Sequence, residues 1–142
     1  MPAPDRDSAA EAHDMLPVDQ SGARDLVGYR SSMLEETGGE CTLLVEARHL
    51  NRLGLLHGGF VSMLLDNSCG VAVRNAIGDP DAAVVTIGLT VNFIAGAGGG
   101  RVTATGRVTG GGRSLKFAEA KLSHQDGRLL ATATATFKII HK

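Results

Sequence analysis

The sequence predicts an α+β fold in which one long helix is wrapped by a curved antiparallel sheet of five to six strands. Three observations lead to this prediction. One long central segment lacks strand alternation, several shorter segments alternate between apolar and polar residues, and glycine clusters or an Asp-Gly pair separate the shorter segments. A length of 142 residues fits one domain with one core. We expect a flexible tail over residues 1–22 and a single domain over residues 23–142.

The elements follow in the order two strands, one helix and four strands. Two strand-like runs, residues 27–34 and 41–50, lie on either side of Gly38-Gly39, which predicts a hairpin. The long segment over residues 60–77 is apolar almost all round and stops at Gly78-Asp79-Pro80, which is typical of a buried helix. The four later strands are predicted over residues 85–93, 101–109, 114–123 and 129–140.

The faces of the strands predict where the helix packs. Apolar residues alternate along the strand over residues 85–93 and should form one buried face, namely Val85, Ile87, Leu89, Val91 and Phe93. The inner face of the last strand is built mainly of alanines, so the helix can approach it closely. The chain has 19 glycines, a share nearly twice the usual ~7%, and we expect most of them at turns.

Composition and charge argue against several classes of function. The 14 Lys and Arg residues balance 15 Asp and Glu residues, so the chain lacks the positive field that nucleic acid or an anionic membrane would require. No segment has the ~20 apolar residues of a membrane span and no signal peptide opens the chain, so we expect a cytoplasmic protein. Five scattered histidines show no metal-ligand spacing, and we expect neither a metal nor a cofactor.

The residues before and inside the helix depart from what folding alone requires. Asp66 lies within an apolar helix, where a carboxylate needs partners. Gly58 and Gly59 open that helix, where backbone N–H groups lack partners within the helix and the dipole favours negative charge. Taken singly, these residues also have structural interpretations. Asp66 can be solvated or capped, His57 can be a hydrogen-bonded structural histidine, and Asn51 can bond to its own loop.

Taken together, these residues resemble one known family. The string Asn51-x-x-Gly54-x-x-His57-Gly58-Gly59, with Asp66 seven residues after the second glycine, is similar to that of the hotdog-fold acyl-CoA thioesterases of the PaaI-like branch. The resemblance runs from about residue 26 to residue 140. It implies the hotdog fold and an enzyme that hydrolyses an acyl-CoA thioester to the free acid and coenzyme A.

The resemblance also implies a role for each catalytic residue. Asp66 acts as the nucleophile or as the general base for water, and the Gly58 amide polarises the thioester carbonyl. Asn51 and His57 shape and orient the site, and Thr86 helps to hold the attacking water. Substrate contacts are implied for three further residues: Gly59, Arg113 and Ser114. The last two lie in a turn that resembles the one contacting the nucleotide end of coenzyme A, although a plain surface arginine is an equally good interpretation of Arg113.

Other interpretations remain open. The same fold could serve as a non-catalytic acyl-CoA-binding module, or as a hydratase or dehydratase with a histidine base opposite a carboxylate. Cys69 lies near Asp66 in the sequence, but no histidine or positive charge accompanies it, so we interpret it as a small buried residue and not as a nucleophile. The resemblance favours an aromatic or medium-chain acyl group.

The spacing of Gly58 and Asp66 predicts that two chains share each active site. Eight residues of helix separate them, which is ~12 Å along the axis at ~1.5 Å per residue. One carbonyl needs the amide ~3 Å from its oxygen and the attacking group ~3 to 3.5 Å from its carbon. A single chain cannot easily supply both groups. We therefore expect a homodimer with shared sites, assembled further into a homotetramer as a dimer of dimers.

Overall fold

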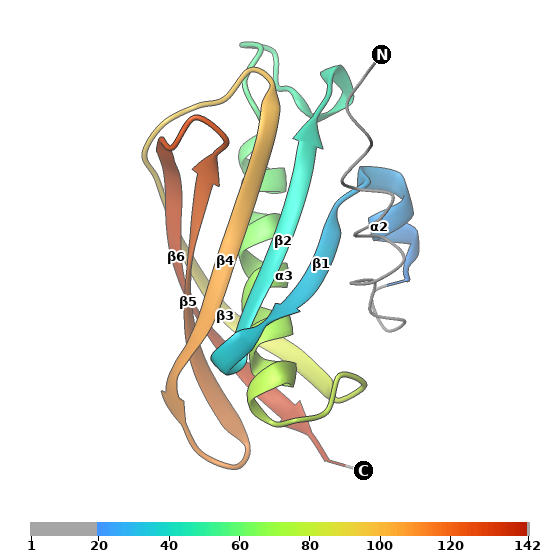
Figure 1. Ribbon diagram of the computed structural model, residues 1–142, viewed down its shortest axis with the longest axis vertical. Coiled ribbons are helices and arrows are strands. Elements are labelled where there is room, and N and C mark those ends of the chain that lie inside the picture. Colours follow the sequence, from blue (N-terminus) through green and yellow to red (C-terminus); the bar gives the residue numbers. More distant parts are fainter. Residues whose placement is uncertain (1–19, 142) are drawn as a thin grey trace.

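The computed structural model describes residues 20–141 and shows one long helix held by a six-stranded antiparallel sheet (Figure 1). The strands follow the order β1-β2-β4-β5-β6-β3 across the sheet, so β1 (Arg30–Leu34) and β3 (Ala83–Phe93) form its two edges. The inner strands are β2 (Gly38–Val45), β4 (Gly100–Gly111), β5 (Leu115–His124) and β6 (Leu129–Ile140). The helix α3 covers Gly58–Ala76 and contacts all six strands. The predicted fold class and the order of these elements are confirmed.

The first described residues form a short helix that the sequence pattern did not predict. Helix α2 covers Gly22–Val27, with Ser21 Oγ accepting the Arg24 N–H at its start. Gly28 ends it with a φ of 89°, which glycine adopts readily. Val27 therefore closes a helix and does not open a strand. Residues 1–19 of the predicted tail lie outside the described residues.

The opening hairpin also differs in detail from the prediction. A single 3₁₀ turn, η2 over Glu35–Thr37, connects β1 to β2, and Gly38-Gly39 begins β2 instead of forming the turn. A second 3₁₀ turn, η3 over Ala47–His49, follows β2, which therefore ends at Val45 and not at residue 50. The buried ring of His49 holds this turn, because its Nδ1 accepts the Glu46 N–H at 2.9 Å.

Helix α3 approaches the sheet most closely at two glycines within strands. Gly39 of β2 and Gly106 of β4 are direct cross-strand partners. A Cβ atom would lie 2.3 Å from the Ser68 carbonyl oxygen if placed on Gly39, and 2.7 Å from it if placed on Gly106. Any side chain there would therefore push the helix away from the sheet. The predicted turn at Gly39 is therefore wrong, whereas Gly106 lies within the strand predicted over residues 101–109. Both glycines lie directly against the middle of α3.

The predicted buried face of β3 is wrong at three of its five residues, because Phe93 at its end is exposed as well as Val85 and Ile87 at its start. Val85 is 45% exposed and Ile87 is 57% exposed. A β-bulge between Thr86 and Gly88 shifts the register of β3 against β6, so the alternation of faces reverses at that point. As a result, Thr86 faces the helix and its two apolar neighbours face away.

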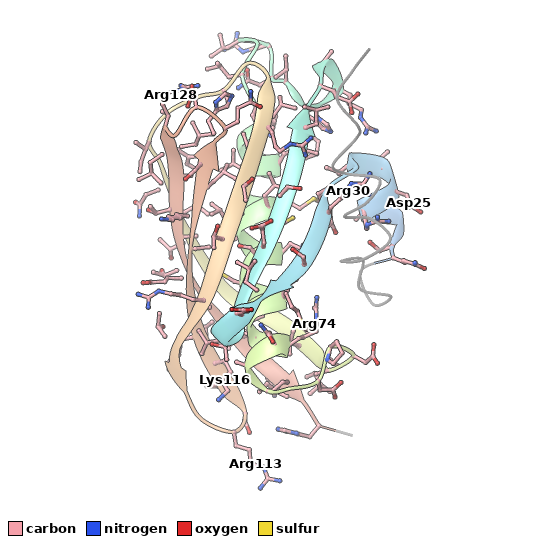
Figure 2. All side chains as sticks on the ribbon, viewed as in Figure 1. Asp25, Arg30, Arg74, Arg113, Lys116 and Arg128 are labelled. Carbon is pink, nitrogen blue, oxygen red and sulfur yellow. The ribbon has the colours of Figure 1, made fainter. Side chains whose placement is uncertain are left out.

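The two ends of α3 lie at opposite ends of the molecule. The helix begins near the turn between β5 and β6, where Arg128 projects, and ends near the turn between β4 and β5, where Arg113 and Lys116 project (Figure 1, Figure 2). We call the end of the molecule where α3 begins the helix-start end, and the end where α3 stops the helix-finish end. Within residues 20–141, no helix is long and apolar enough to cross a membrane.

Candidate active site

The start of α3 presents a backbone N–H without a partner. His57 caps the helix, because its Nδ1 accepts the Gly59 N–H at 2.8 Å and its carbonyl oxygen accepts the N–H of Phe60 at 2.9 Å. The Gly58 N–H has no acceptor within the described part of the chain. An N–H at this end of a helix is a favourable donor to an anionic oxygen. Because His57 Nδ1 is an acceptor, the neutral ring carries its proton on Nε2.

Asn51 organises the loop that leads into this helix start. Its Oδ1 accepts the N–H of Leu53 at 2.9 Å and the N–H of Leu55 at 3.2 Å. The loop continues into Leu56, whose N–H donates to the carbonyl oxygen of Ala97 at 2.8 Å. The carboxamide oxygen is therefore used within the loop, which leaves the Nδ2 amide group of Asn51 to contact a ligand.

Asp66 and Thr86 meet across the gap between the helix and the edge strand. Asp66 is half-buried in α3, and its Oδ1 accepts a hydrogen bond from Thr86 Oγ1 at 2.7 Å. The bulge in β3 makes this contact possible, because it turns Thr86 towards the helix. Among residues 20–141, no other hydrogen bond reaches the Asp66 side chain. Oδ2 is therefore available to a water molecule or a ligand.

Cys69 lies one helical turn beyond Asp66 and is fully buried. Burial, followed by the negative charge of Asp66 as the next largest cause, raises the pKa of its thiol to about 12. At neutral pH the group is therefore a protonated thiol, which agrees with its interpretation as a small buried residue. In the described residues, no three His, Cys, Asp or Glu side chains gather as a metal ion would require.

Phe93 is a site residue that the sequence pattern did not single out. A Cβ atom on Gly58 would lie 3.3 Å from Cε1 of the Phe93 ring, so the ring packs against the helix start. The ring is nevertheless 61% exposed. Thr86 and Phe93 thus contact α3 from the two ends of β3. Their spacing of seven would place them on opposite faces of a regular strand, and only the bulge brings both to the helix.

Arg113 and Ser114 do not join these residues. Both are exposed in the turn between β4 and β5, at the helix-finish end of the molecule (Figure 2). Arg113 borders a hollow of about 540 Å³ that the loop after α3 shares. The structure therefore divides the sequence-predicted residues into three places: the helix start with its loop, the Asp66–Thr86 pair and the β4–β5 turn.

Within one chain, the Gly58 N–H and the Asp66 carboxylate cannot both reach one carbonyl group. Gly58 and Asp66 belong to the same unbroken helix, eight residues apart, which is ~12 Å along its axis. Strand β3 contacts both, but through opposite ends, at Phe93 and at Thr86. The separation inferred from the sequence is therefore present in the structure.

Comparison with known proteins points to one family. Residues 53–131 match the family model described as the thioesterase superfamily. A Pseudomonas aeruginosa protein described as a candidate esterase is 34% identical over 98 residues, which cover 68% of this chain and 72% of that protein. Mouse acyl-coenzyme A thioesterase 13 is 29% identical over 98 residues, covering 68% of this chain and 69% of that protein.

Solved structures agree with these similarities. A thioesterase family protein of Silicibacter pomeroyi superposes with a TM-score of 0.77 at 31% identity, covering 86% of this chain and 91% of that one. The PaaI protein of the Escherichia coli phenylacetic acid degradation operon superposes with a TM-score of 0.76 at 21% identity, covering 86% of each chain. The second likeness concerns the fold alone.

Proposed function

Because the chain belongs to the thioesterase superfamily and has the hotdog fold, we propose that it is an acyl-CoA thioesterase. It hydrolyses an acyl-CoA thioester to the free acid and coenzyme A. Asp66 is the nucleophile or the general base, and the Gly58 N–H polarises the carbonyl. The hydrogen bond between Thr86 and Asp66 is the observation that supports this proposal most directly, because it aims a carboxylate of an apolar helix away from the core.

The proposed reaction follows from the groups at hand. Asp66 Oδ2 either attacks the thioester carbon, which gives an anhydride once the thiolate has left and water then hydrolyses that anhydride, or takes a proton from water as the water attacks. Both routes place a negative charge on the carbonyl oxygen, to which the Gly58 N–H donates. The C–S bond then breaks. A thiol with a pKa of ~8.5 leaves as thiolate with little help from an acid, so the reaction needs no cofactor.

A screen of acyl groups tests the proposal. The purified chain is offered short-chain, medium-chain, long-chain and aromatic acyl-CoAs, and the release of free thiol is followed. We expect the highest kcat/KM with a medium-chain or aromatic acyl group. Crotonyl-CoA separates the alternatives, because hydration of its double bond without thiol release would identify a hydratase. Tight binding of every acyl-CoA without any reaction would identify a binding module.

The proposed active site is shared between two chains of a homodimer. Strand β3 ends the sheet, so one side of its backbone has no strand partner within residues 20–141. Two β3 strands can pair antiparallel about a twofold axis that lies midway between Thr86 and Phe93. This pairing places Thr86 of each chain opposite the partner's Phe93. Thr86 holds Asp66 and Phe93 packs on Gly58, so this pairing brings the amide of one chain to the carboxylate of the other.

Mixed dimers test the shared site. An Asp66→Asn chain lacks the carboxylate, and a Gly58→Pro chain lacks the amide hydrogen, so each homodimer should be nearly inactive. In a mixed dimer, one site combines the intact Asp66 of one chain with the intact Gly58 of the other. Purified mixed dimers should therefore show about half of the wild-type activity, and random pairing should return roughly a quarter. Mixed dimers as inactive as both parents would exclude a shared site.

Arg113 tests the contact with coenzyme A. If its guanidinium pairs with a phosphate, Arg113→Ala should raise KM for an acyl-CoA roughly tenfold, the size of a lost charge-assisted hydrogen bond. The same variant should leave KM unchanged for the matching acyl-pantetheine, which has no nucleotide. Steady-state kinetics on both substrates measure the difference, and an equal effect on the two would exclude the phosphate contact.

A further inference from the structure

The hollow at the helix-finish end has walls of different chemistry. The β4–β5 turn contributes Arg113 and the start of β5 contributes Lys116, two cationic side chains that project at that end of the molecule (Figure 2). The loop after α3 contributes two carboxylates, Asp79 and Asp81, and Ile77 belongs to the apolar part of the lining. Phosphate groups are attracted to the cationic wall and repelled by the acidic one. The β4–β5 wall is therefore the side of the hollow that suits the phosphates of a coenzyme A.

The length of the substrate decides which active site this hollow can serve. About 13 bonds separate the sulfur of coenzyme A from its first phosphorus, and about 21 bonds separate it from the 3′-phosphorus. At the ~3.5 Å that an extended chain covers in three bonds, these phosphorus atoms lie at most about 15 Å and about 25 Å from the sulfur. Only a hollow within that range can hold the phosphates.

The hollow of the chain that supplies Asp66 is within reach. Eleven residues of α3 separate Asp66 from Ile77, which is about 17 Å along the helix axis. A thioester held at Asp66 can therefore extend along its own α3 and place its phosphates at Arg113 of the same chain.

The hollow of the partner chain is too far away. In the shared site the partner's helix runs antiparallel, with its Gly58 opposite Asp66. Nineteen residues separate Gly58 from Ile77, which is about 28 Å along that helix in the opposite direction. This distance exceeds the fully extended length of the substrate, before any sideways offset is added.

We propose that each bound acyl-CoA is divided between the chains in a fixed way: the chain that supplies Asp66 also holds the phosphates, at Arg113 and Lys116. The other chain supplies only the Gly58 N–H and the residues around it. This inference rests on the proposed function and its shared site. It assigns Arg113 to the active site of its own Asp66.

Two sets of mixed dimers test the assignment, each carrying both substitutions once. In the first set, Asp66→Asn and Arg113→Ala lie on one chain, and the other chain is wild type. The single working site then uses Asp66 and Arg113 of the wild-type chain, so KM should equal the wild-type value. In the second set, the two substitutions lie on different chains. The working site then uses Asp66 of the chain that lacks Arg113, so KM should equal that of the Arg113→Ala homodimer, roughly tenfold higher.

The outcomes separate this inference from the proposed function. Three results would overturn the inference: KM values reversed between the two sets, equal KM values in both sets, or no effect of Arg113→Ala on KM in the homodimer. None of these results would contradict the proposed function, as long as the wild type hydrolyses acyl-CoA. Loss of all thiol release from the wild type would instead overturn the proposed function. The expected pattern holds for larger assemblies too, because every working site takes both groups from one chain. Arg107→Ala is the matched control, because this exposed arginine pairs with Glu119 and should leave KM unchanged.

Discussion

Asp66→Asn should lower kcat roughly 10²- to 10⁴-fold, the range expected when a general base is lost, and a lost nucleophile should cost at least as much. The amide keeps the shape of the side chain and an oxygen that can still accept the Thr86 hydrogen bond, so the fold should persist. What disappears is the basic oxygen that acts on water or on the thioester carbon. Single-turnover and steady-state assays of thiol release, with the best acyl-CoA of the screen, measure the loss.

Asp25→Asn is the matched control for this variant. Asp25 is an exposed carboxylate of α2 beside Arg24, away from the candidate site (Figure 2). It undergoes the same change of chemistry, so kcat should stay at the wild-type value. Thermal unfolding of both variants checks that the fold is intact. Thiol release by Asp66→Asn at close to the wild-type rate would remove Asp66 from the mechanism.

Gly58→Pro should lower kcat about 10²- to 10³-fold, because it deletes one hydrogen that donates to the oxyanion. The structure suits this substitution unusually well. Gly58 is the first residue of α3, where proline is favoured and where no intrahelical bond is lost. His57 before it has φ −59° and ψ 136°, a conformation that a residue before proline adopts readily. The fold should therefore tolerate the change while the donor is lost.

Gly58→Ala separates the loss of the hydrogen from the added bulk. Alanine keeps the N–H, and its Cβ would contact only the exposed ring of Phe93, which can shift. We expect kcat of this variant to stay within several-fold of the wild type. If alanine and proline lowered kcat equally, crowding at Phe93 would explain the loss, and the role of the amide would be wrong.

The sequence was informative where one local pattern dominates. The apolar segment over residues 60–77 and its Gly-Asp-Pro stop predicted α3 to within two residues at its start and one at its end. The alternation over residues 129–140 predicted β6 with its bounds and its inner face. Both elements follow from periodicity and strong stop signals, which a single sequence displays.

The sequence was misleading where a contact depends on more than one element. The residues around Thr86 follow the apolar–polar alternation of a regular strand. Nothing in the sequence indicates the bulge that forms when β3 pairs with β6. Gly39 was predicted at a turn, because only the packed helix shows why a Cβ cannot fit there. For the site, the string around His57 located the helix start and Asp66. Phe93 was missed as a neighbour of Gly58, because the bulge hides the spacing that links it to Thr86.

The bulge in β3 also limits how the chain can change in length during evolution. Thr86 and Phe93 lie an odd number of residues apart and still contact the same helix, because the bulge absorbs one residue. Deletion of a single residue elsewhere in this stretch would turn one of the two away from α3. Deletion of Ile87 together with the bulge would keep both contacts, now six residues apart. During evolution, this stretch can therefore lose or gain one residue only if the bulge is lost or gained with it. The change in length and the change in the bulge should appear together in related chains.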